Sequence, residues 1–219
     1  MSQTERTSAH GTPNDDVISP LHTMKLQIQC LLLVCTFCLL WLPGLEAAGC
    51  SFPDPAPNFV NEQYNGKWYE IGKIQTKGGA FFERKCVCTQ LDAFITNSPN
   101  WGDGTVDNEC REKTVDGDWT NVTATLFDET QEQPGRWLTK VGNFGGPANY
   151  TIIAFEEDDY AVEYDCTTSS LGVTNYCIHV LSRAPTMDED VFNKLMQDAN
   201  DKGLNPQNLP IQMTLQEGC

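Results

Sequence analysis

Residues 67–76 read KWYEIGKIQT, and this stretch decides the fold class. It gathers aromatic and β-branched residues within ten positions and leads into the Gly78-Gly79 pair, a composition that predicts a β-strand followed by a loop. Seven further stretches of this kind follow at similar spacing, separated by turn-forming residues. They are residues 86–96, 105–113, 119–128, 136–141, 150–156, 160–166 and 175–183. The regular spacing predicts an all-β sandwich or barrel.

The periodicity changes after the eighth predicted strand. Val191, Phe192, Leu195 and Met196 recur at helical spacing, and acidic residues fill the turn before them. We expect one amphipathic α-helix of about 14 residues here, packed on the outside of the barrel, with Thr186 or Asp188 as its N-cap. A short strand is expected near 211–216, and residues 143–149 (NFGGPAN) are expected to form a loop.

The N-terminal part divides into two segments that we do not expect in the mature fold. Residues 1–23 are polar and are interpreted as a disordered extension upstream of a start at Met24, although a start at Met1 is not excluded. Residues 24–48 combine one lysine, an apolar run and small residues, which predicts a signal peptide, the alternative being a retained signal anchor. Residues 49–219 are then one secreted, extracellular domain with no transmembrane segment after cleavage.

Cysteine content and charge support export. Seven cysteines remain in residues 49–219 without zinc-type spacing, which indicates disulfides formed in an oxidising compartment. Asn121 and Asn149 each begin a glycosylation sequon. A net charge of −16 argues against binding to nucleic acids or anionic membranes.

Three short motifs carry a resemblance to a known family. The Gly66-Lys67-Trp68 sequence opens the first predicted strand, Asp159-Tyr160 opens the seventh, and Arg183 closes the eighth. In this order they resemble the three signature motifs of the lipocalins. The stretches GKWYEIGKI, DDYAVEYDC and VLSRAPTMDEDVF are similar to the lipocalin branch that contains apolipoprotein D, the insect bilin-binding proteins and the crustacyanins. The resemblance covers residues 50–219.

The resemblance implies an eight-stranded antiparallel up-and-down barrel with one helix packed outside. It also implies that Trp68 closes the bottom of the barrel under a cation–π contact with Arg183. By the pattern of this branch, Cys50 pairs with Cys166, and Cys86 or Cys88 pairs with Cys219.

A third disulfide is expected from the strand positions. Cys86 and Cys88 lie two apart on one strand, so we do not expect them to pair with each other. Cys110 lies on the neighbouring predicted strand at a height near Cys88. We therefore expect Cys88–Cys110 as the third bridge, which leaves Cys86 for Cys219 and Cys177 as a free thiol.

The expected ligand site is the open end of the barrel, at loops 76–85, 114–118, 142–149 and 167–174. The nearest aromatic residues are Phe81, Phe82, Trp119, Trp137, Phe144, Tyr150 and Tyr176. Aromatic residues around such a mouth suit an apolar ligand, and the resemblance favours a bilin or carotenoid over a lipid, sterol or retinoid. Basic residues also gather here and are interpreted as solvated loop charges, the alternative being partners for ligand carboxylates: Lys73, Lys77, Arg84 and Lys85.

The sequence gives little sign of catalysis. His179 is the only histidine after residue 49, so we expect neither a metal site nor a Ser-His-Asp triad. The predicted function is a non-enzymatic carrier of one small hydrophobic ligand, with no required cofactor. Two alternatives stay open, a lipid isomerase that uses a free thiol and a pigment-complex subunit that acts through protein partners. A homo-oligomer also stays open.

Overall fold

The computed structural model describes residues 49–96, 104–127, 133–142 and 144–219, with the backbone alone described for residues 144–146. The predicted extension (1–23) and signal peptide (24–48) lie outside these residues. Among the described residues, no helix has the length and apolar character that crossing a membrane requires.

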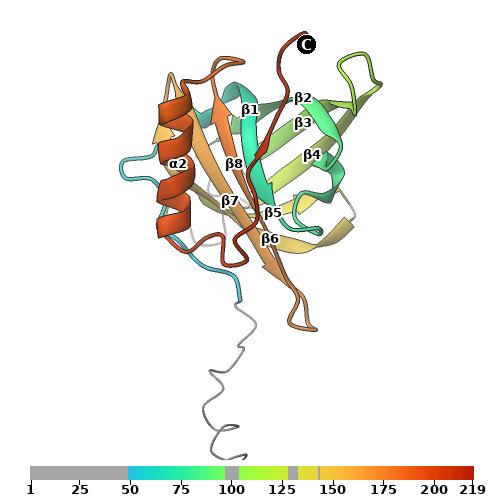
Figure 1. Ribbon diagram of the computed structural model, residues 1–219. Coiled ribbons are helices and arrows are strands. Elements are labelled where there is room, and N and C mark those ends of the chain that lie inside the picture. Colours follow the sequence, from blue (N-terminus) through green and yellow to red (C-terminus); the bar gives the residue numbers. More distant parts are fainter. Residues whose placement is uncertain (1–48, 97–103, 128–132, 143) are drawn as a thin grey trace, which may run out of the picture. The chain divides into compact units, whose positions relative to one another are not determined.

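Eight antiparallel strands close into a barrel (Figure 1). Consecutive strands pair from β2 round to β8, β8 pairs with β1, and β1 pairs with β2 to complete the ring. A two-residue strand, β9 (Gln212–Met213), pairs with Gly72 and Lys73 of β1. The barrel strands are β1 (Gly66–Gln75), β2 (Cys86–Ile95), β3 (Gly104–Glu112), β4 (Trp119–Phe127), β5 (Arg136–Val141), β6 (Phe144–Glu156), β7 (Tyr160–Thr168) and β8 (Thr174–Ser182). The predicted fold class is confirmed.

The predicted loop at 143–149 is wrong, because β6 begins at Phe144. Its first residues pair with the end of β5, from Val141 opposite Phe144 to Leu138 opposite Asn149. The register between the two strands shifts between Thr139 and Val141, which lets both ends of β5 pair with β6. Gly-Gly-Pro suggests a loop when it is considered alone, but pairing with a neighbouring strand overrides that local preference.

One apolar layer fills the closed end of the barrel. A 3-10 helix, η1 (Asn61–Tyr64), covers this end together with the chain that precedes it, from which Ala56 and Phe59 join the layer. Phe59 packs edge-on against Phe155 at 4.7 Å between ring centroids, and Tyr64 stacks on Trp68 at 5.4 Å. Both Tyr64 and Trp68 have no exposed surface, so this end of the barrel is sealed.

A second apolar layer lies between the barrel and helix α2 (Glu189–Asp201), which runs alongside β8 and β7 in Figure 1. Asp188 is the N-cap, and its side chain accepts hydrogen bonds from the backbone N–H groups of Asp190 and Val191. The buried stripe of α2 is Phe192, Leu195, Met196 and Ala199. A Cβ atom on Gly72 would lie 2.8 Å from the Phe192 ring, so the glycine allows the helix to approach β1 closely.

Three disulfides join cysteines of the described residues, and two of them correct the predicted pairing. Cys50 is bonded to Cys166 as expected, but Cys86 is bonded to Cys110 and Cys88 to Cys219. The predicted Cys88–Cys110 and Cys86–Cys219 bonds are therefore wrong. The reason is a bulge in β2 after Val87, where Cys88 takes a φ of 55°. This bulge breaks the alternation of side chains, so Cys86 turns to β3 and Cys88 to the C-terminal segment.

Candidate functional site

The three motifs of the sequence meet at the closed end of the barrel. The guanidinium carbon of Arg183 lies 3.5 Å from the centroid of the Trp68 ring. Arg183 also donates hydrogen bonds to the backbone carbonyls of Gln63, Lys67 and Glu157, at 2.9–3.0 Å. The backbone N–H of Arg183 donates a hydrogen bond to the backbone carbonyl of Asp159, which precedes Tyr160 in the second motif. These residues hold the base of the barrel, and the end at which a ligand site is predicted is the opposite one.

A cavity of about 190 Å³ lies inside the barrel toward that opposite end, and we call it the calyx. Its wall is largely apolar. The apolar and aromatic lining residues are Ala80, Phe81, Phe82, Leu91, Val106, Val122, Ala124, Leu126, Val141, Ala148 and Tyr150. Val122, Ala124 and Leu126 come from alternate positions of β4, as strand geometry requires for one inward face. The short 3-10 helix η2 (Phe81–Glu83) forms the edge nearest the predicted mouth.

Of the seven aromatic residues predicted to contact a ligand, the structure brings Phe81, Phe82 and Tyr150 to the calyx. Trp119 does not reach it, because odd positions of β4 face outward; the residue is 46% exposed, and Arg111 lies over its ring. Trp137 points inward but is packed at the closed end against Phe59. The side chain of Phe144 lies outside the described residues.

Tyr176 is a further correction, because it lies on the outer face of β8. Its side chain is buried with Ile178 and Val180 in the layer under α2, and its hydroxyl donates to Asn205 at 2.9 Å. Side chains alternate along a strand, so the odd-numbered residues of β8 are those that face the calyx. One inward residue of β8 is His179, which lines the cavity.

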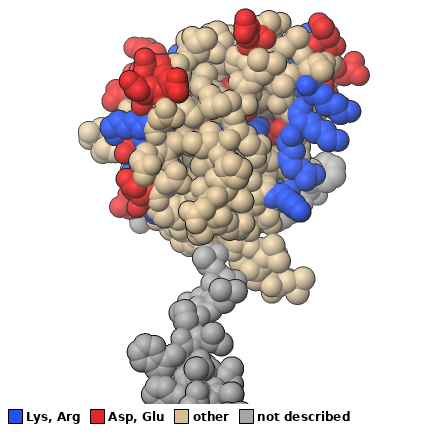
Figure 2. All heavy atoms as spheres, viewed as in Figure 1, with Lys and Arg blue, Asp and Glu red and all other residues tan. Residues whose placement is uncertain are grey.

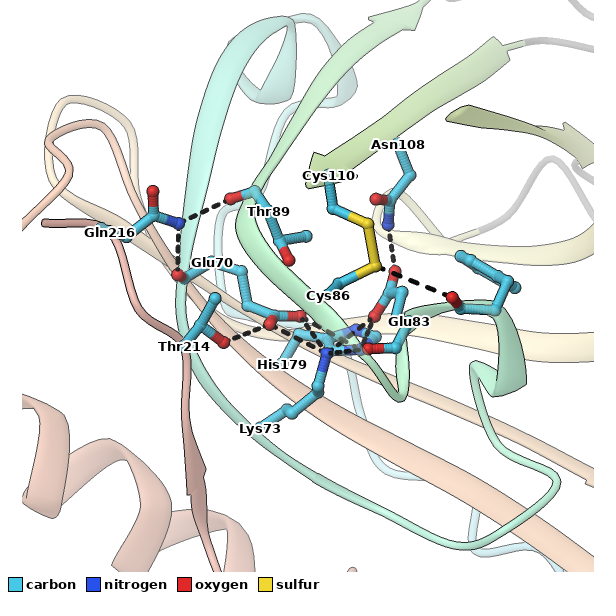
Figure 3. The surroundings of a disulfide bond; sticks show 11 residues. Glu70, Lys73, Glu83, Cys86, Thr89, Asn108, Cys110, His179, Thr214 and Gln216 are labelled. Atoms are coloured by element: carbon cyan, nitrogen blue, oxygen red, sulfur yellow. Dashed lines mark hydrogen bonds and ion pairs between the residues drawn. A yellow bond between two sulfur atoms is a disulfide. The ribbon is translucent and has the colours of Figure 1, made fainter. Parts of the chain in front are cut away.

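A cluster of buried charges occupies the wall beside the apolar lining (Figure 3). Glu70 and Lys73 of β1, Glu83 of η2 and His179 of β8 point toward one another in this view. The Lys73 Nζ lies 3.0 Å from Glu70 Oε1 and 3.5 Å from Glu83 Oε2. The Lys73 side chain is only 4% exposed, so its interpretation as a solvated loop charge is wrong. Lys77, Arg84 and Lys85 are exposed, as solvated loop charges would be, and their alternative role as partners of ligand carboxylates stays a prediction.

His179 joins this cluster to a second set of polar groups. Its Nε2 lies 3.0 Å from Glu83 Oε2 and 2.9 Å from the Sγ of Cys177, the one cysteine of residues 49–219 that forms no disulfide. Its Nδ1 lies 3.2 Å from Glu163 Oε2. The other oxygen of Glu163 accepts hydrogen bonds from two buried hydroxyls, those of Tyr64 and Tyr150.

Burial and charge shift the pKa values of these groups in opposite directions. Burial raises the pKa of the Cys177 thiol to about 12 and that of Asp165, on the calyx wall, to about 7. Burial also favours the neutral form of Glu83, but His179 and Lys73 hold its pKa at about 2. Burial alone would lower the pKa of His179, whereas Cys177 and Glu83 beside the ring raise it well above its usual range. The Cys177 thiol therefore stays protonated at neutral pH.

Sequence reasoning missed this cluster, although a signal was present. Glu163 and Asp165 lie two apart in β7, and Cys177 and His179 lie two apart in β8. In each strand the residues between and beyond them are apolar or aromatic on the opposite face. Polar residues at alternate positions of buried strands predict a polar patch facing the barrel interior.

The comparisons with known proteins agree on one family. A family model described as a lipocalin-like domain matches residues 61–213. Bovine (Bos taurus) apolipoprotein D is 30% identical over 162 residues, which cover 74% of this chain and 80% of that protein. A prostaglandin-H2 D-isomerase of Felis catus is 22% identical, covering 67% and 73%. The solved structure of lobster apocrustacyanin A1 superposes with a TM-score of 0.56 at 15% identity, covering 74% and 81%, which shows a shared fold.

Proposed function

Because this chain belongs to the lipocalin family, whose members bind small hydrophobic molecules, we propose that it is a carrier that holds one apolar ligand in the calyx. The observation that carries the proposal is the apolar lining of the cavity, contributed by η2 and strands β2 to β6. Burial of apolar ligand surface against this lining would provide most of the binding free energy. Phe81, Phe82 and Tyr150 are the aromatic residues proposed to contact the ligand.

The size of the calyx limits what it encloses. Pockets for drug-sized ligands measure about 300–1,000 Å³, and an apolar cavity of about 150 Å³ accepts benzene. At about 190 Å³, the calyx accommodates a compact apolar body or one segment of a longer molecule. A bilin or carotenoid is therefore proposed only with part of the chromophore passing between the loops at the mouth. A lipid, sterol or retinoid is likewise proposed with only part of the molecule inside the calyx.

Secretion is part of the proposal. Three disulfides in residues 49–219 are typical of proteins that fold outside the cytosol. The predicted signal peptide would direct the chain there.

Figure 2 shows carboxylates gathered at the edge of one face of the molecule and few charged side chains over its centre. A strongly acidic carrier of this kind stays dispersed by mutual repulsion.

A pair of neighbouring substitutions on β4 tests the carrier proposal. Val122 lines the calyx, whereas Thr123 is exposed on the outer face. Val122→Trp should fill the cavity and abolish the fluorescence enhancement of the neutral apolar dye Nile red, while Thr123→Trp should leave it unchanged. Equal binding by both variants would refute the calyx as the site. A visible absorbance band in protein from its native source, lost on extraction, would support the pigment ligand.

A thiol-dependent isomerase is the second candidate, and the contact between Cys177 and His179 is the observation that favours it. The sequence showed no histidine partner for the thiol, but the structure places Nε2 at 2.9 Å. Against catalysis, the pKa of Cys177 is raised to about 12 by burial, so little thiolate forms at neutral pH. We expect no turnover of prostaglandin H2 above the spontaneous rate; turnover that Cys177→Ser abolishes would establish the enzyme instead.

A further inference from the structure

We propose that Asp165, Cys177 and His179 form a binding site for a divalent transition-metal ion, such as Zn²⁺, on the wall of the calyx. The carboxylate oxygen, the sulfur and the ring nitrogen of these residues all lie within 4.8 Å of one another. Thiolate, imidazole and carboxylate are the ligands that zinc takes in proteins.

The strand register explains why these three side chains converge. Asp165 and Cys177 are directly opposite in the β7–β8 ladder, and His179 follows Cys177 two positions along β8. All three therefore project from the same inner face of two paired strands. A site built on adjacent strands is held rigidly, and small side-chain rotations would bring the ligand atoms to metal-bonding distances.

The imidazole is oriented for coordination through Nε2. Its Nδ1 lies 3.2 Å from Glu163 Oε2, so an Nδ1–H group can donate to that carboxylate. Metal-binding histidines commonly donate the other ring N–H to a carboxylate in this way. Glu163 is itself held by the hydroxyls of Tyr64 and Tyr150.

Two atoms with lone pairs face Nε2 at short distance, the Sγ of Cys177 at 2.9 Å and Glu83 Oε2 at 3.0 Å. A metal ion bound by Nε2 and Sγ would lie between these atoms, and the Cys177 proton would be released as the sulfur coordinates.

The calyx gives an ion access to these residues, because Asp165 and His179 both line it. A water molecule from the cavity would complete the four ligands that zinc commonly takes.

A second group of potential ligands in the described residues, Glu70 with Glu83 and His179, carries no proposal. The Lys73 ammonium lies 3.0 Å from Glu70 and 3.5 Å from Glu83, so a cation already stands between these two carboxylates. The Asp165–Cys177–His179 group has no such lysine among its hydrogen-bonded or ion-paired contacts.

Cobalt(II) is the probe for the experiment, because coordination of a thiolate to Co²⁺ produces a charge-transfer band in the near ultraviolet. Titration of the purified protein should produce this band, saturating at an equimolar ratio, and added Zn²⁺ should remove it. Cys177→Ser should abolish the band. Glu163→Gln should weaken Co²⁺ binding about 10- to 100-fold, the usual effect of losing the carboxylate behind a metal-bound histidine.

Asp116→Asn is the matched control, since this exposed carboxylate lies in the β3–β4 turn; the variant should bind Co²⁺ as the wild type does. X-ray absorption on the zinc-loaded wild type gives a readout that needs no variant to fold. It should show one sulfur at about 2.3 Å and nitrogen or oxygen at about 2.0–2.2 Å. Absence of the cobalt band, a band that persists in Cys177→Ser, or a zinc shell without sulfur would overturn the proposal.

Discussion

The substitution Lys73→Met tests whether the calyx wall is a matched set of buried charges. The ammonium of Lys73 lies 3.0 Å from Glu70 and 3.5 Å from Glu83, and the three side chains are at most 4% exposed. Solvent therefore screens these contacts little. Removing one partner from a buried ion pair costs about 3–5 kcal/mol, because the remaining charge is left without compensation. We expect the free energy of unfolding to fall by about that amount.

Urea unfolding at pH 7, followed by circular dichroism, provides the measurement. Lys67→Met is the matched control, since Lys67 lies on the same strand but is exposed, and its ammonium donates a hydrogen bond to the neutral side chain of Gln90. Its loss should change stability by no more than about 0.5 kcal/mol. The combination of Lys73→Met with Glu70→Gln should recover part of the loss, because one buried negative charge is removed as well. If Lys73→Met and Lys67→Met unfold at the same urea concentration, the reasoning is refuted.

Three further predictions concern packing, the closed end and modification. Gly72→Ala should destabilise the fold by about 1–3 kcal/mol, since its Cβ would meet the Phe192 ring at 2.8 Å; an unchanged melting temperature would contradict this. Arg183→Lys keeps the charge over Trp68 but cannot replace three hydrogen bonds to backbone carbonyls, so urea unfolding should show a loss of about 1–3 kcal/mol. Asn121 is exposed on β4, so glycosidase treatment of protein secreted from eukaryotic cells should lower its mass, and Asn121→Gln should remove that change; an identical mass shift in the variant would place the glycan elsewhere.

Much of the fold could be predicted from local pattern. The strand at 67–76 and its seven successors lie within one or two residues of the observed bounds, apart from the start of β6. In β4 the alternate residues Val122, Ala124 and Leu126 share one face, and that face lines the interior. These predictions succeed because a strand's two faces follow from the parity of its residues once one face is buried.

The ligand site was predicted less well, for a related reason. Aromatic residues were chosen by their closeness to the mouth along the chain, and Trp119 and Tyr176 have the parity of the outer face. The disulfide pairing failed at Cys88, where a bulge inverts the parity that the argument assumed. Bulges depend on how two strands fit together and leave little trace in one sequence.

The amino-acid sequence by itself determined the barrel, the external helix and the family, because these depend on periodicity and short motifs within single elements. Only the tertiary structure decided what lies inside the calyx. Glu70, Glu83, Glu163 and His179 come from four elements up to 109 positions apart in the sequence. Their meeting point depends on barrel closure and on the register between β7, β8 and β1, and both are set by packing across the whole chain.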